Sequence, residues 1–368
     1  MFAVYILLAV LILLLMVTIH EFGHYVAGRI LGFKINEFSI GFGPAIFQRV
    51  NKRGEKISIR VFPLGGYCAF EGEDDIVQDS HNTKDKPKVF EEYEKQEEEQ
   101  EPAETKKTYL TFDEQKPWKR IIVLISGALF NILSGIIFSF IFIAVVGNSL
   151  PIITEVYDTP NASLIREDDV IIAVDGHKIT ILDSLSELLA QKKENQEFTL
   201  TVIRDGVETD ISGIRKVKYD SDGKQIIGIG IAIGDYKIEK YNFLESAGYA
   251  FPFTLKMAGA ILSAFGDIFR GIGLDQLSGP VGTITEMAKI TQANIYNVLV
   301  LLPLLAVNLG IFNLFPIPAL DGSKVVFTLI EWIRGKPINR KIENIIHFVG
   351  FIFLIGLVIL IDLLKFIK

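Results

Sequence analysis

His20, Glu21 and His24 form an H-E-x-x-H pattern at the end of an apolar stretch. Residues four apart on a helix share one face, so the two imidazoles can bind a single Zn²⁺ while the glutamate activates a metal-bound water. With five histidines in 368 residues, chance alone would place this pattern in about one chain in a hundred. The alternative is that polar residues merely end a hydrophobic helix. It is weaker, because ionisable groups at membrane depth are costly and usually mark function.

A third zinc ligand is needed, because catalytic zinc commonly has three protein ligands and one open position for water. Asp321 is the best candidate, since it follows an apolar stretch interrupted by Pro316 and Pro318, where irregular backbone can line a cavity. By itself, Asp321-Gly322 would be read equally well as a turn that ends a helix. Among the other histidines only His347 has a comparable depth, and it is the weaker candidate.

The elements that must position these residues are mainly membrane helices. The chain is 49% hydrophobic, and four stretches are long and apolar enough to cross a bilayer: residues 2–19, 121–151, 293–320 and 344–361. Residues 243–269 contain four interruptions by charges or proline and predict an interfacial amphipathic helix instead. The net charge of −7, without a basic patch, argues against nucleic acid as a partner. The single cysteine, Cys68, excludes a disulfide framework and is expected to be a buried small residue.

Lysine and arginine positions predict the orientation of these spans. They gather after the first span, before the second, and between the third and fourth, which places those flanks in the cytoplasm. Residues from about 150 to 290 should then lie outside the cytoplasm. Asp321 and the two histidines would share the cytoplasmic side of the membrane. The two lysines at the C-terminus count weakly against this orientation.

The segments between the spans differ in character. A small mixed α/β domain is predicted outside the cytoplasm, with strands at 152–156, 170–174 and 198–204, a helix at 182–192 and further strand signal at 225–233. On the cytoplasmic side, residues 57–70 alternate as a strand with turn residues at Pro63, Gly65 and Gly66. The charged segment that follows has few apolar residues, so we expect a mobile loop.

These patterns predict a polytopic α-helical membrane protein with about four transmembrane helices, a membrane-associated β element and a small α/β domain. The expected order begins with a first transmembrane helix at 1–25, a β or re-entrant element at 26–70 and a charged loop at 71–116. A second helix at 117–150, an extracytoplasmic domain at 151–217 and a linker with the interfacial helix at 218–292 follow. The chain then continues with a third helix that carries the aspartate motif at 293–322, a cytoplasmic loop at 323–343 and a fourth helix at 344–368.

The chain resembles the site-2 protease family of intramembrane zinc metalloproteases (peptidase M50 type), in its bacterial RseP-like branch with one PDZ-like domain. The motifs that carry the resemblance are HEFGH at 20–24, GFGP at 41–44, FPLGGY at 62–67, KPWKR at 116–120, LSGPVG at 277–282 and the segment 313–322. The resemblance implies that His20, His24 and Asp321 bind Zn²⁺ and that Glu21 is the general base. Asn313 would bind the substrate or stabilise the developing oxyanion. The remaining substrate-binding residues would be Gly65, Gly66, Tyr67, Pro316 and Pro318.

The implied function is cleavage of single-span membrane proteins within their transmembrane segment, in a bacterial cell membrane. Expected partners are the lipid bilayer and substrates of the anti-sigma factor or remnant signal peptide type, trimmed beforehand by another protease. The PDZ-like domain would act as a size filter. Two alternatives are a membrane scaffold with a structural metal and a zinc transporter. A structural zinc site has no need of Glu21, and four spans without an inverted repeat do not suit a transporter.

Overall fold

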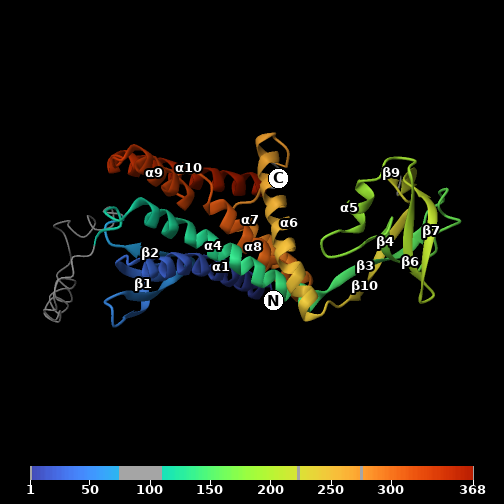
Figure 1. Ribbon diagram of the computed structural model, residues 1–368, viewed down its shortest axis with the longest axis horizontal. Helices are drawn as coiled ribbons and strands as arrows, with labels where there is room; N and C mark the ends of the chain where they lie inside the picture. The colour runs from blue at the N-terminus through green and yellow to red at the C-terminus, as the bar shows by residue number, and fades with distance from the viewer. Residues whose placement is uncertain (1, 74–109, 222–223, 274–276, 368) are drawn as a thin grey trace. The chain divides into compact units, whose positions relative to one another are not determined.

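The computed structural model describes residues 2–73, 110–221, 224–273 and 277–367 (Figure 1). Most of the predicted charged loop, residues 74–109, lies outside this described part. The chain packs as two compact units. The first contains Met1–Ser134, Gly273–Asn294 and Leu305–Lys368, and the second contains Gly135–Ile272 and Ile295–Leu304.

Four helices in the described residues are long and apolar enough to cross a membrane, which agrees with the four expected spans. They are Phe2–Leu31 (α1), Pro117–Val146 (α4), Ile295–Asn313, which includes α8 (Val298–Asn313), and Arg340–Leu363 within α10 (Arg340–Ile367). The interrupted stretch forms a helix as well, α6 (Phe243–Phe269), which is not among these four. A capping box between Asn242 and Glu245 starts α6.

A long β-hairpin follows α1 in the first unit. Its strands are β1 (Ile35–Val50) and β2 (Lys56–Phe70), paired antiparallel with several register shifts. The hairpin runs beside the C-terminal half of α1 (Figure 1). Strand β2 lies where strand alternation predicted it. Strand β1 falls within the β or re-entrant element expected at 26–70, although no separate strand was assigned to its residues. Much of the hairpin carries exposed apolar side chains, which include Phe42, Ile46, Phe47, Val50, Ile59, Val61 and Phe62.

The helix of the third predicted span is shorter than expected, because it ends at Asn313 and not near residue 320. Helix α7 (Pro280–Ala293) ends where the span was expected to begin, a short 3-10 turn at Ile295–Asn297 follows, and α8 ends at Asn313. After a loop with two prolines, Asp321 becomes the first residue of α9 (Asp321–Arg334). The predicted cytoplasmic loop at 323–343 is therefore largely helical.

The second unit contains a six-stranded antiparallel sheet with the order β10-β3-β4-β6-β7, where β5 pairs with β4. The strands are β3 (Asn148–Val156), β4 (Val170–Val174), β5 (His177–Lys178), β6 (Glu197–Arg204), β7 (Val207–Arg215) and β10 (Ile231–Glu239). Its core includes the fully buried side chains of Ile153, Ile171, Leu200 and Ile214. Helix α5 (Leu185–Ala190) packs its Leu185 and Leu188 into that core.

The predicted end of this domain at residue 217 is wrong. Strand β10 pairs along the whole length of β3, from Ile231 opposite Val156 to Glu239 opposite Asn148, so the sheet closes at residue 239. A separate hairpin of β8 (Val217–Ser221) and β9 (Lys224–Gly228) lies between. The pairing of first and last strands joins segments about 80 residues apart, which local alternation does not reveal.

Candidate metal centre

Helix α1 presents His20 and His24 one turn apart, and both side chains are buried. Asp321, 301 residues after His20, approaches them from the start of α9. Its Oδ2 lies 2.9 Å from Nε2 of His20 and 3.2 Å from Nε2 of His24. The two Nε2 atoms are 3.2 Å apart. The structure thus brings together all three residues that the sequence proposed as ligands.

The geometry of these three donors fits a tetrahedral Zn²⁺ site. Zinc ligands at about 2.0–2.1 Å in tetrahedral geometry are separated from one another by roughly 3.3 Å. The observed separations of 2.9–3.2 Å are close to that value. Nitrogen and carboxylate oxygen are also the donors that catalytic zinc uses, and three protein ligands leave a fourth position for water.

Glu21 and two of the three metal donors, His20 and Asp321, line a common cavity of about 300 Å³. Its lining comes from α1, the β-hairpin, the C-terminal part of α8, the loop before α9 and the first residue of α9. The lining includes Val17, His20, Glu21, Phe42, Gly65, Gly66, Leu309, Asn313 and Asp321. A carboxylate beside a metal-bound water can accept its proton, so the arrangement is chemically suited to metal-assisted hydrolysis.

Sequence comparisons decide the family. A model described as Peptidase family M50 matches residues 8–357, nearly the whole chain. The chain belongs to peptidase family M50. A Brucella suis relative named "Putative zinc metalloprotease" is 30% identical over 94% of this chain and 90% of its own length. A Fusobacterium nucleatum relative of the same description is 28% identical over 97% and 96%. "Probable protease eep" of Enterococcus faecalis is 28% identical over 94% and 95%.

The membership confirms the predicted enzyme class and cofactor: this M50 peptidase is a zinc metalloprotease. Together with the four apolar helices, it also supports the expected multi-pass membrane protein. The scaffold and transporter alternatives lose their basis, because the similarity to metalloproteases extends over nearly the full chain.

Three of the predicted substrate-binding residues line the cavity of this M50 peptidase. Gly65 and Gly66 come from β2, and Asn313 comes from the end of α8, with its Nδ2 3.4 Å from Nε2 of His20. A Cβ at Gly66 would lie 2.8 Å from the backbone oxygen of Ser39 and 3.4 Å from Cγ of Glu21. The close approach of Ser39 in the neighbouring strand β1 therefore favours glycine there, whereas the distance to Glu21 is an ordinary contact.

The other three predicted substrate-binding residues lie elsewhere. Tyr67 interacts with Glu37 and Arg60 within the hairpin. Burial raises the pKa of its hydroxyl, and the negative charge of Glu37 and a hydrogen bond to it add to this effect. Pro316 and Pro318 shape the loop before α9. Phe42, which stacks on Tyr67, lines the cavity although its apolar type gave no signal of a site.

In the M50 peptidase, contacts at Nδ1 orient the rings of both histidine ligands. Nδ1 of His24 donates to the backbone oxygen of Val123 at 2.8 Å, which leaves Nε2 unprotonated for zinc. Nδ1 of His20 faces the amide of Asn131, with Nδ2 at 3.3 Å, and Asn131 is fully buried. Oδ1 of Asn131 has no hydrogen-bond partner among the described residues. A 180° flip of the Asn131 amide exchanges Oδ1 and Nδ2, so that Oδ1 accepts a hydrogen bond from Nδ1 of His20. A histidine that binds metal through Nε2 needs such an acceptor for its Nδ1 proton.

Replacing Asn131 should therefore weaken zinc binding. We expect Asn131→Leu to lower the affinity for Zn²⁺ by about 10- to 100-fold, because His20 loses the acceptor that fixes its ring. Asn131→Asp, which still accepts from Nδ1, should stay near the wild-type affinity. Competition with a chromophoric chelator measures both, and equal affinities for wild type and Asn131→Leu would contradict this role.

Close packing of α1 on α4 gives these contacts their geometry. A Cβ at Gly23 would lie 2.5 Å from the backbone oxygen of Ser126, and one at Gly127 would lie 2.4 Å from Nε2 of His24. Small residues let membrane helices approach this closely. Gly23 and Gly127 were not singled out as site residues, because a glycine has no functional group to reveal its role.

Proposed function

We propose that this M50 peptidase cleaves single-span membrane proteins within their transmembrane segment. The observation that carries the proposal is that His20, Glu21 and His24 lie within the apolar helix α1 and meet Asp321 beside a cavity lined by α1, α8 and the hairpin. His20 and His24 lie in α1, whose exposed residues include Val4, Leu7, Leu11 and Leu15. A site at such depth suits a substrate that is itself in the membrane.

The catalytic roles follow from position and chemistry. His20, His24 and Asp321 would hold the metal, which supplies Lewis acidity toward water and the scissile carbonyl when bound. Glu21 is placed to take a proton from water and to return it to the leaving amine. The Asn313 side chain can donate a hydrogen bond from Nδ2 to the oxygen of the scissile carbonyl, which becomes negative when water attacks.

The hairpin offers a way to hold an unwound substrate. A helix in lipid has all its backbone groups bonded internally, so a peptide bond becomes accessible only after local unwinding. A strand edge can replace the lost hydrogen bonds by strand addition. Gly65 and Gly66 lack side chains that would cover this part of β2, and the exposed apolar residues of the hairpin suit contact with lipid or with an apolar peptide.

The orientation and the substrates belong to the same proposal. The similarity to bacterial relatives favours a bacterial cell membrane, and the distribution of Lys and Arg favours an orientation with the metal centre toward the cytoplasm and the PDZ-like sheet domain outside. Substrates would be anti-sigma factors or remnant signal peptides that another protease has already shortened.

The test is cleavage of a single-span model substrate by the purified full chain in detergent. We expect one cut within the apolar span, loss of cleavage with a zinc chelator and recovery when Zn²⁺ is returned. Cutting that is confined to residues outside the span would contradict intramembrane proteolysis, although the protein would still be a metalloprotease.

A deletion tests the role of the sheet domain as a size filter. Replacing residues 157–230 with a short Gly-Ser linker keeps β3 and β10 available to pair while removing the rest of the sheet. We expect this variant to cleave substrates with an intact outer domain at least about 10-fold faster than the wild type does, since a steric filter costing 1.4 kcal/mol already gives that factor. Short substrates serve as the control, and unchanged discrimination between long and short substrates would refute the filter.

A further inference from the structure

The loop between α8 and α9 places Asp321 at the metal centre and has an unusual backbone conformation. It contains Pro316 and Pro318, and Ala319 adopts a φ of 79°. The left-handed region is unfavourable for a residue with a Cβ, so this conformation persists only where the surroundings hold it. Ala319 is two residues before Asp321, and a change in its backbone would turn the start of α9 and displace the carboxylate.

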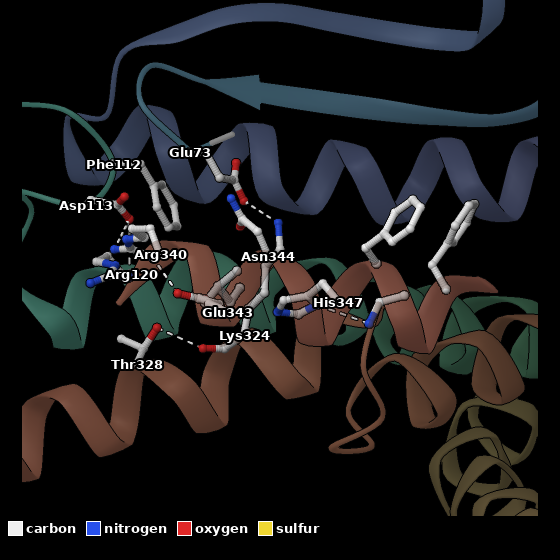
Figure 2. A pocket seen from close by; sticks show the side chains of 14 residues that line it. Glu73, Phe112, Asp113, Arg120, Lys324, Thr328, Arg340, Glu343, Asn344 and His347 are labelled. Carbon is white, nitrogen blue, oxygen red and sulfur yellow. Dashed lines mark hydrogen bonds and ion pairs between the residues drawn. The ribbon is translucent and has the colours of Figure 1, made fainter. Parts of the chain in front are cut away.

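His347 of α10 makes the contact that holds Ala319. The backbone N–H of Ala319 donates to Nδ1 of His347 at 3.1 Å. Accepting at Nδ1 requires the neutral tautomer with its proton on Nε2. The ring is set by Phe327 of α9, with centroids 5.5 Å apart. Figure 2 shows His347 among the side chains that line a pocket of about 270 Å³ beside the loop.

Gly350, one turn further along α10, makes the second contact. A Cβ at this position would lie 2.2 Å from Cβ of Pro318, so α10 touches the loop directly at the residue before Ala319. Residues three apart share a helix face. His347 and Gly350 therefore press on two consecutive loop residues from the same side.

We propose that His347 and Gly350 form a latch through which α10 fixes the position of Asp321, so that His347 is a positioning residue for the metal centre and not a zinc ligand. The inference rests on the proposed assignment of Asp321 as a ligand. It makes zinc affinity depend on the last apolar helix, although none of the described residues of α10 belongs to the group of three metal donors.

Side-chain replacements at His347 give the first test. The Oδ1 of asparagine lies as far along the side chain as Nδ1 of histidine, whereas the glutamine oxygen reaches toward the Nε2 position. We expect the full-length His347→Asn variant to bind Zn²⁺ within about threefold of the wild type, and His347→Ala and His347→Gln to bind about 10- to 100-fold more weakly. The readout is the dissociation constant from chelator competition, with the Co²⁺ absorption spectrum as a report on ligand geometry.

A matched glycine pair gives a second test that leaves the imidazole in place. Gly350→Ala should weaken zinc binding to a similar extent and alter the Co²⁺ spectrum. Gly356→Ala is the same change on the same helix, and within the described part of the chain its Cβ would meet nothing within 4 Å. It should leave both readouts unchanged. The size-exclusion elution volume and the midpoint of thermal unfolding of the metal-free variants show whether each variant is folded.

The outcomes separate the latch from the ligand assignment. If Asp321→Ala binds Zn²⁺ like the wild type, the assignment of Asp321 fails and the latch falls with it. If Asp321→Ala loses zinc while His347→Ala and Gly350→Ala keep wild-type affinity and spectrum, the latch alone is overturned. Weakened binding in both α10 variants, with normal binding in His347→Asn and Gly356→Ala, supports it.

Discussion

Glu21→Gln is expected to lower the rate of peptide cleavage by about 10²- to 10⁴-fold, the usual contribution of a general base, while the protein still binds zinc. Glutamine has nearly the same shape and fills the same part of the cavity, but it cannot take a proton from water. The metal donors come from His20, His24 and Asp321, so the zinc site should survive. Cleavage of the single-span substrate and zinc content of the same preparation measure the two effects.

His24→Ala is the companion variant, because it removes a donor and should lose both zinc and cleavage. The contrast between these variants separates proton transfer from metal binding. A Glu21→Gln enzyme that cleaves at the wild-type rate would show that another group acts as the base. Loss of zinc in Glu21→Gln would show that the glutamate helps to hold the metal.

Arg120→Met is expected to destabilise the protein by about 3 kcal/mol, the lower part of the range for breaking a buried ion pair. Nη1 of Arg120 lies 2.7 Å from Oε2 of Glu331, and both side chains are about 95% buried, with 5% and 6% exposed. Without Arg120 the carboxylate would stay buried with weaker compensation. The backbone N–H of Ile338 still donates to Oε1 of Glu331, which limits the loss. Reversible unfolding in mixed detergent measures the change.

Arg270→Met is the matched control for this prediction. Arg270 also pairs with a carboxylate, that of Asp267 at 3.2 Å, but its side chain is 75% exposed. Such a pair contributes at most about 1 kcal/mol, because water screens the charges. The double variant Arg120→Met, Glu331→Gln should recover part of the lost stability, since no charge remains unpaired. Equal effects of Arg120→Met and Arg270→Met would argue against a structural role for the buried pair.

The Arg120–Glu331 pair also illustrates why some pairing partners were beyond sequence reasoning. Glu331 lies in a segment that was predicted as a loop, and 211 residues separate it from Arg120. Composition reveals charge, but it does not reveal which charge is buried. Likewise, the strand signal at 225–233 was visible, whereas its pairing with β3 was not.

The sequence by itself determined the features that depend on local spacing. The i, i+4 geometry of a helix places His20 and His24 on one face, and the length of apolar runs identifies four candidate spans. Asp321 could be selected as well, because depth and side of the membrane restrict the possible third donors. Only the tertiary structure decided how these donors are held. Asn131, Val123 and Gly127 reach the histidines from α4, and His347 and Gly350 reach the Asp321 loop from α10. Such contacts depend on how helices that are distant in the sequence pack together. The sequence around a buried asparagine, a backbone oxygen or a glycine has no pattern that identifies its contact partner in the folded protein.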